Sequence, residues 1–320
     1  MTRKECLGIG LTEEDHGMKI GYPCRNLTIG CSSGKTFRLK SYSEERIIST
    51  VQDNLRCLLD MCRFNAEHGI LFLRITSDLI PFASHPVCRF DWRTFFADSL
   101  DEIGALIRSQ GMRISMHPDQ FTLINSIDPA IFARSNAELA YHAAVLEALG
   151  LDTRAKIQIH IGGVYGDRKA SIDRFVERFG LLDQSIRQRL IIENDDRRYT
   201  LRDCLGVSER TGLPVLFDVL HHEVNGSGES LRQAVRLTKA TWSDKDGIPM
   251  VDYSSQAKGR KPGVHTNSID LAHFVAFLED TRPFDFDVML EIKDKERSAM
   301  KALDGASVDP RLQNEKIRAL

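Results

Sequence analysis

The sequence lacks several features that would place it in a common class. None of its 320 residues belong to a run of roughly 20 apolar residues, the length that a membrane-spanning helix needs. The first 17 residues include Glu13, Glu14 and Asp15 and have no apolar centre, so they do not resemble a signal peptide. The formal net charge is only −2, so a polyanionic partner would have to bind a local basic surface.

Two further absences bear on compartment and fold. The seven cysteines are scattered, and no two of them form a C-x-x-C pair. This usage is typical of reduced, mostly buried thiols, so we expect free cysteines and a cytoplasmic protein. The first apolar run also lacks a glycine-rich turn, since positions 21–24 read Gly-Tyr-Pro-Cys. That argues against an open doubly wound sheet, which is the main alternative fold.

The chain does contain eight short apolar runs, separated by amphipathic segments with helical period. Alternating strands and helices are the pattern of parallel βαβ units, and the chain is long enough for one large core. We therefore predict a single-domain α/β protein, a (β/α)8 TIM barrel over residues 18–301, with a flexible extension at 1–17 and a loose tail at 302–320. The eight runs are Lys19–Cys24, Ile70–Thr76, Met112–Pro118, Lys156–Gly162, Leu190–Asp195, Val215–His221, Ile248–Ser255 and Asp287–Asp294.

The clearest predicted helix runs from Ser43 to Gly69. Ser43 is a good N-cap residue, and Gly69 suits the position just past a helix end. The other segments with helical period are Trp92–Gln110, Ile131–Leu149, Ile172–Gln188, Thr200–Thr211, Ser230–Thr241 and Ile269–Leu278.

Most of the later apolar runs end in residues that bind metals. In a TIM barrel the carboxyl end of every strand faces one common site, so ligands far apart in sequence would converge there. Glu193 is the sharpest case, because it follows the buried run 190–192 and a carboxylate there needs a partner or a cation. The predicted metal ligands are His117, His160, Glu193, Asp218, His221, Asp252, His265 and Glu291.

The ligand types limit the choice of metal. Imidazoles mixed with carboxylates suit Mn²⁺, Zn²⁺ or Fe²⁺ better than Mg²⁺ or Ca²⁺, which prefer oxygen ligands alone. So many donors indicate two or three ions bridged by Glu193 or Asp218, an arrangement that stabilises phosphoryl displacement. The structural alternative is that Asp195 caps a helix and Glu193 forms a salt bridge.

Six motifs, in order along the chain, resemble the UV damage endonuclease family. The resemblance runs from about Met18 to about Lys301. It implies a metal-dependent TIM barrel, related to endonuclease IV, that hydrolyses a phosphodiester of duplex DNA on the 5′ side of pyrimidine dimers and 6-4 photoproducts. It also implies divalent ions, with Mn²⁺ foremost and Mg²⁺, Co²⁺ or Zn²⁺ as alternatives. The motifs are Gly21–Leu27, His117–Phe121, Ile192–Asp195, Phe217–His222, Tyr253–Gln256 and Leu290–Glu296.

The resemblance also implies roles for residues that contact DNA. Gln120 and Phe121 match the pair that the family inserts into the duplex opposite the lesion, and a damaged base pair is cheaper to open than an intact one. Tyr22 and Asn26 match residues that line the pocket for the flipped dinucleotide. The expected partner is UV-damaged double-stranded DNA. We expect the protein to act as a monomer and to bind no membrane.

For catalysis, the resemblance points to Glu193 as a bridging ligand and to Lys293 as a basic position that could hold a phosphate. One departure stands out. The family commonly carries a carboxylated lysine and a histidine ligand where this chain has Met250 and Asp252. Because Asp252 restores the lost negative charge, we predict that it is a ligand and that the number or selectivity of metals is altered.

Three other functions remain open at this point. The first is an abasic-site endonuclease of the endonuclease IV type, and the second is a metal-dependent sugar isomerase or epimerase, whose barrels use a similar ring of Glu, Asp and His. The third is a damage-binding protein that has lost catalysis through the changes at Met250 and Asp252.

Overall fold

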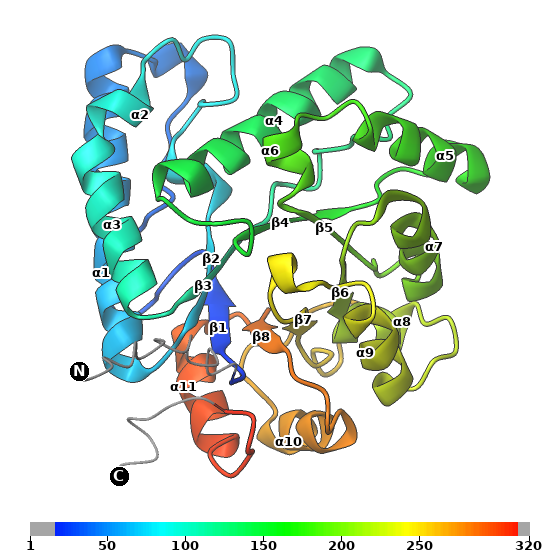
Figure 1. The fold of residues 1–320 in the computed structure, drawn as a ribbon. Coiled ribbons are helices and arrows are strands. Elements are labelled where there is room, and N and C mark those ends of the chain that lie inside the picture. Colours follow the sequence, from blue (N-terminus) through cyan, green and yellow to red (C-terminus); the bar gives the residue numbers. More distant parts are fainter. Residues whose placement is uncertain (1–16, 313–320) are drawn as a thin grey trace, which may run out of the picture.

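The computed structural model describes residues 17–312, which form a closed barrel of eight parallel strands. The strands follow one another in sequence order, and β1 closes the barrel by pairing with β8. Figure 1 shows the strands at the centre with the helices around them. The predicted (β/α)8 barrel is confirmed. The strands are β1 (Ile20–Pro23), β2 (Phe72–Ile75), β3 (Arg113–Met116), β4 (Lys156–His160), β5 (Leu190–Glu193), β6 (Val215–Asp218), β7 (Met250–Tyr253) and β8 (Asp287–Leu290).

Helix α1 (Glu44–His68) begins and ends where its sequence predicts. The side chain of Ser43 accepts a hydrogen bond from the backbone N–H of Arg46, and Gly69 adopts the left-handed conformation at φ 68°. These two caps satisfy backbone groups that a helix leaves unpaired at its ends.

The predicted segments at 200–211 and 230–241 are also helices within two residues of those bounds, whereas two other segments differ. The segment from Trp92 is divided at Phe96, whose backbone leaves the helical region, and the segment expected at 172–188 starts earlier and is interrupted after Phe179. A helix following β8 was not predicted. The helices after α1 are α2 (Trp92–Phe95), α3 (Ala97–Ser109), α4 (Pro129–Ala148), α5 (Arg168–Phe179), α6 (Gln184–Arg187), α7 (Leu201–Thr211), α8 (Val219–Val224), α9 (Leu231–Lys239), α10 (Leu271–Asp280) and α11 (Glu296–Gly305).

The carboxyl-terminal segment differs from the loose tail expected from residue 302. Helix α11 continues to Gly305, and the chain stays packed as far as Leu312, which forms a β-bridge with Met18. The segment reads as polar, yet Arg311 is buried, pairs with Asp309 and donates hydrogen bonds to backbone carbonyls. Residues 313–320 and the predicted extension, apart from Gly17, lie outside the described residues.

One cysteine pair contradicts the expectation of free thiols. Cys31, in the loop after β1, and Cys57, in α1, form a disulfide with their Cα atoms 5.8 Å apart. This pairing depends on the loop folding back onto the helix, which spacing along the chain does not reveal. The free cysteines of the described chain are Cys24, Cys62, Cys88 and Cys204. Within residues 17–312, no helix is both long enough and apolar enough to cross a bilayer.

His142, in α4, gives the fold a predicted sensitivity to acid. It is fully buried, with Nδ1 2.8 Å from the carbonyl oxygen of Glu138 and Nε2 3.0 Å from the hydroxyl of Ser77. Burial disfavours the protonated ring and lowers its pKa to about 4. In the unfolded chain histidine takes up a proton near pH 6.5, so between pH 6.5 and 4 the unfolded state binds more protons and becomes relatively more stable.

We expect the wild-type protein to lose about 2 kcal/mol of unfolding free energy through His142 between pH 7.5 and pH 5. In a His142→Gln variant, whose side chain stays neutral, the unfolding free energy should fall by about 2 kcal/mol less over the same pH range. Urea unfolding of both metal-free proteins at the two pH values measures the difference, in which the titrations of all other groups cancel. Parallel pH dependence in the two proteins would show that His142 does not titrate as described.

Candidate metal centre

The alternation of side chains along each strand places the site inside the barrel. Neighbouring residues of a strand point to opposite faces, so every second side chain points inward. An apolar layer is formed by a buried cluster separate from the main core, made of Phe72, Ile191, Leu216, Met250 and Met289. Two positions further along the same strands, and therefore one layer closer to the carboxyl ends, are Arg74, Glu193, Asp218, Asp252 and Glu291.

Three groups of side chains in this region could hold metal ions, because the ligand atoms within each group lie within 4.8 Å of one another. Glu193 belongs to the first two groups and Asp218 to the last two, so the three form one continuous cluster. The groups are His117 with His160 and Glu193, then Glu193 with Asp218 and His221, then Asp218 with Asp252 and Glu291. Seven of the eight predicted ligands therefore converge, although they come from six different strands or the segments that follow them.

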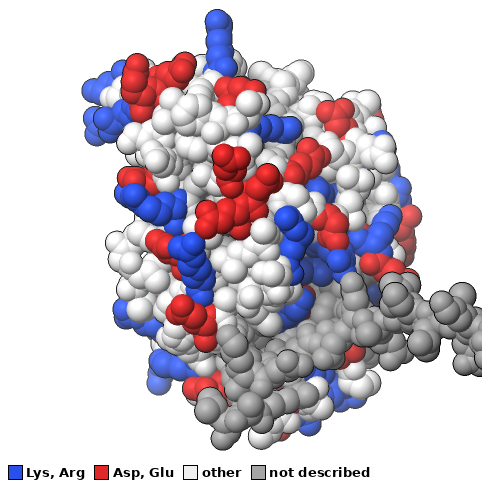
Figure 2. All heavy atoms as spheres, turned by 60° about the vertical axis from the view of Figure 1, so that its left-hand side comes forward, with Lys and Arg blue, Asp and Glu red and all other residues white. Residues whose placement is uncertain are grey.

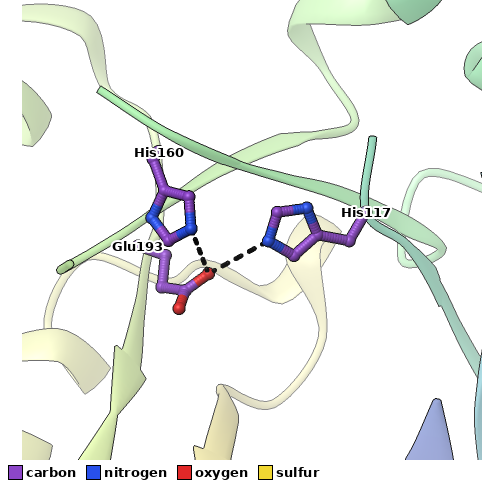
Figure 3. A group of neighbouring side chains, drawn as sticks. All are labelled: His117, His160 and Glu193. Atoms are coloured by element: carbon purple, nitrogen blue, oxygen red, sulfur yellow. Dashed lines mark ion pairs between the residues drawn. The ribbon is translucent and has the colours of Figure 1, made fainter. Parts of the chain in front are cut away.

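Glu193 lies at the middle of the cluster. Figure 3 shows the rings of His117 and His160 directed at the same carboxylate oxygen, with Nε2 atoms 3.4 Å and 3.8 Å from Oε2. The other oxygen, Oε1, lies 3.0 Å from Nδ1 of His221. Strand register explains part of this, since His160 of β4 pairs directly with Glu193 of β5. Glu193 is thus the residue shared by the first two groups.

The imidazoles follow one another around the rim of the barrel. Ring centroids are 5.4 Å apart for His117 and His160, 5.9 Å for His160 and His221, and 6.1 Å for His221 and His265. His265 is outside the three groups, but its Nδ1 donates to the carbonyl oxygen of Glu291 at 2.6 Å. That bond leaves Nε2 as the atom that can bind a metal, and His117 is oriented in the same way by Pro118.

The pKa values of the carboxylates and imidazoles in the cluster are shifted from their usual ranges. Burial raises the pKa of Asp218 well above its usual range, and it also raises the pKa of Asp252, where the adjacent guanidinium of Arg74 opposes it. Glu193 is equally buried, yet adjacent imidazoles, foremost His160, hold its pKa well below the usual range. Burial would lower the pKa of His221, but Asp218 and then Glu193 raise it to about 11. A cation bound among these groups would favour their deprotonated forms.

The donor set fits divalent cations. Oδ2 of Asp218 is buried and has no hydrogen-bond partner, although a buried carboxylate oxygen normally has one. Mixed imidazole and carboxylate ligands are the set that first-row transition ions such as Mn²⁺ prefer. Glu193, Asp218, His117, His160 and His221 would hold such ions.

Two polar residues in contact with the cluster, Arg74 and Gln158, were not predicted as site residues from the sequence. Arg74, at the end of β2, donates hydrogen bonds to Asp252 and Glu291, and Gln158 of β4 donates to Glu193 and Asp252. What could have identified them is their position in the strands, from which their side chains point into the barrel as those of the candidate ligands do. A lone arginine or glutamine in a strand carries no metal-binding pattern of its own.

The residues expected to contact DNA fall into two sets. Gln120 and Phe121 lie in the loop after β3, four residues or fewer beyond His117, and the Phe121 side chain is 72% exposed. Lys293 is also exposed, in the loop after β8. Tyr22 and Asn26, by contrast, are buried: the amide of Asn26 donates to the hydroxyl of Tyr22, which donates to Asn65. Neither offers an open surface to a ligand in this structure.

Comparison with known proteins places the chain in a family. The sequence model of UV-endonuclease UvdE matches residues 18–313. A UV DNA damage endonuclease of Clostridium perfringens is 37% identical over 289 residues, covering 90% of this chain and 70% of that protein. The crystal structure of SacUVDE is 43% identical, covers 92% of this chain and all of that one, and superposes with a TM-score of 0.89. Endonuclease IV from Thermus thermophilus, at 14% identity, 78% and 93% coverage and a TM-score of 0.53, shares the fold alone. A family match over nearly the whole barrel, with the metal-ligand types gathered at its carboxyl end, establishes that this chain belongs to the UV-endonuclease UvdE family.

Proposed function

We propose that this protein is a DNA repair endonuclease that uses divalent cations to nick duplex DNA on the 5′ side of UV lesions. The observation that carries the proposal is the cluster around Glu193, where three imidazoles face one carboxylate at the open end of the barrel. The family supports the reaction, because its relatives bear the name of that activity.

Bound divalent cations activate water and neutralise charge on a phosphodiester in such reactions. The protein's own residues would hold these cations in place. Glu193 and Asp218 provide the anionic ligands, and Gln158 holds the Glu193 carboxylate by donating a hydrogen bond to Oε2. The backbone carbonyls of Pro118 and Glu291 fix the ring orientations of His117 and His265. Mn²⁺ is the proposed ion because it suits this mixed donor set.

Exposed cations surround the proposed DNA-binding end of the barrel. They lie in the loops after β1, β5, β7 and β8, which all leave the carboxyl ends of strands. By contrast, Figure 2 shows acidic and basic side chains interspersed on the described atoms of the side that carries α1 to α3. A duplex, whose affinity comes largely from phosphate contacts, should therefore bind at the rim. The exposed cations of these loops include Arg25, Arg197, Arg198, Lys258, Arg260, Lys261 and Lys293.

Phe121 is the proposed wedge in the damaged duplex. Its exposed ring stands in a loop that Asp119 stabilises by accepting a hydrogen bond from the Phe121 backbone N–H at 2.8 Å. An apolar ring at this position can fill the gap left when a dimer, which pairs and stacks poorly, leaves the helix.

The test of the proposed function is a nicking assay with Mn²⁺ on three plasmids: UV-irradiated, abasic and intact. Nicking of the irradiated plasmid, abolished by a chelator, supports the proposal. Nicking of the abasic plasmid alone would favour the endonuclease IV type. Binding of irradiated DNA without any strand break would identify a damage-binding protein, and turnover of ketoses without nicking would identify an isomerase.

Substituting the wedge should weaken incision without affecting the fold. We expect Phe121→Ala to reduce nicking of UV-irradiated DNA by roughly 10- to 100-fold, because a stacked aromatic ring contributes about 1–3 kcal/mol to nucleic-acid binding. Leu181→Ala is the control, since Leu181 is 67% exposed but lies between α5 and α6, in the connection that leads to the amino end of β5. Equal incision by wild type and Phe121→Ala would show that the ring takes no part in lesion recognition.

A further inference from the structure

One of the polar side chains at the carboxyl end of the barrel, that of Arg74, is a permanent cation. Arg74 projects from β2 into the group of carboxylates made of Asp218, Asp252 and Glu291, and its side chain is only 4% exposed. A guanidinium does not lose its proton in a protein, so this charge is present at every pH at which the protein is folded. We infer that Arg74 takes the place of a metal ion in this third group, so that the fully loaded protein holds two cations.

The contacts of Arg74 engage the atoms that a third ion would need. Nη2 donates to both carboxylate oxygens of Asp252, at 2.8 Å and 2.7 Å, and to Oε1 of Gln158 at 2.8 Å. Nη1 donates to Oε1 of Glu291. A cation bound by Asp252 and Glu291 would therefore compete with the guanidinium for their oxygens. It would also lie against a like charge in a buried site, where such repulsion is strong.

The other two groups are free of this competition. Among the hydrogen bonds and ion pairs of residues 17–312, none joins Arg74 to His117, His160, His221, Glu193 or Asp218. By hydrogen bonds, Glu193 connects to the arginine through Gln158, whose Nε2 donates to Glu193 and whose Oε1 accepts from Arg74. The two remaining groups share Glu193, which would bridge two ions in them.

The identity of residue 252 agrees with this inference. A carboxylate accepts two hydrogen bonds from one guanidinium, whereas a neutral imidazole offers only one acceptor and an imidazolium none. One layer below, Met250 is buried in the apolar cluster and supplies no ligand. Asp252 is thus the counter-ion of Arg74, which revises our expectation that it binds metal. The inference rests on the proposed metal centre but not on the substrate.

The test is the number of Mn²⁺ ions per chain. Purified full-length protein is saturated with Mn²⁺, freed of excess ion by gel filtration, and analysed for metal and protein content. We expect two ions in the wild type, two in Arg74→Lys, which keeps the charge, and three in Arg74→Met, which removes it at similar length. Three ions in the wild type, or an equal number in wild type and Arg74→Met, would overturn the inference.

Two further measurements keep the outcome unambiguous. If Arg74→Met does not fold, Arg74→Met combined with Asp252→His removes the unpaired charge and adds an imidazole ligand, and it should again hold one ion more than the wild type. A double variant with no additional ion would contradict the inference. Nicking of irradiated plasmid is measured separately. Two bound ions without nicking would refute the proposed function alone. A wild type that binds fewer than two ions would refute the role of Arg74.

Discussion

Replacing Glu193 with glutamine is expected to remove most of the bound metal and to lower nicking of UV-irradiated DNA by more than about 100-fold. Loss of a group outside the ligand shell already costs about 10- to 100-fold in affinity or activity, and Glu193 is itself the central ligand. Glutamine keeps the size of the side chain but removes the charge that faces His117, His160 and His221. The loss of metal binding and of nicking should therefore come from the missing charge, while the barrel stays folded.

Metal content after saturation with Mn²⁺, nicking rate and thermal unfolding of the metal-free protein measure the three consequences of Glu193→Gln. Glu296→Gln is the matched control, because Glu296 is also a fully buried carboxylate but accepts its hydrogen bonds from the backbone of Leu27 and the side chain of Thr28. It should bind as much metal as the wild type. Full metal content and full nicking in Glu193→Gln would remove Glu193 from the centre and the metal-bridging hypothesis with it.

The convergence of the candidate ligands could be predicted because the strand ends of a parallel barrel meet at one location. His117, His160, Glu193 and Asp218 each follow an apolar run, and the topology alone brings such positions together. His221 was expected at the end of a strand, yet β6 ends at Asp218 and His221 lies in α8, with Asp218 as the N-cap. One turn of helix brings the imidazole back over the carboxylate, so the prediction of proximity did not depend on the correct secondary structure.

The environment of each side chain was less predictable than its location. The pairing of Arg74 with Asp252 joins residues on β2 and β7, and only the closed barrel shows that they point at each other. Tyr22 and Asn26 were expected to line the pocket for a flipped dinucleotide, but both are buried, and Asn26 donates a hydrogen bond to the Tyr22 hydroxyl. A family motif identifies positions, whereas burial depends on how the loops pack over them.

The strand that leads to Tyr22 gives the largest expected effect on stability. Gly21 of β1 pairs with Phe72 of β2 and with Met289 of β8, at the seam that closes the barrel. A Cβ atom at Gly21 would lie 1.7 Å from the carbonyl oxygen of Phe72 and 2.3 Å from its carbonyl carbon. Since both atoms are backbone, no side-chain rotation can relieve the overlap.

Gly21→Ala should therefore destabilise the fold by more than about 4 kcal/mol, the range reached when a substitution disrupts a closely packed interior. Gly206→Ala is the matched control, because Gly206 lies in α7 with open space around its Cβ position. In a helix this change should stabilise by about 0.5–1 kcal/mol. Urea unfolding and the yield of folded protein measure both effects.

The same substitution should disturb the metal centre, because Arg74 pairs with Pro23 across the β1–β2 seam. Separating these strands would displace the guanidinium from Asp252 and Glu291 and leave buried carboxylates without their counter-ion. Any folded fraction of Gly21→Ala should consequently bind Mn²⁺ with a different stoichiometry from the wild type. If Gly21→Ala unfolds at the same urea concentration as Gly206→Ala, β1 and β2 cannot be as closely paired as the closed barrel requires.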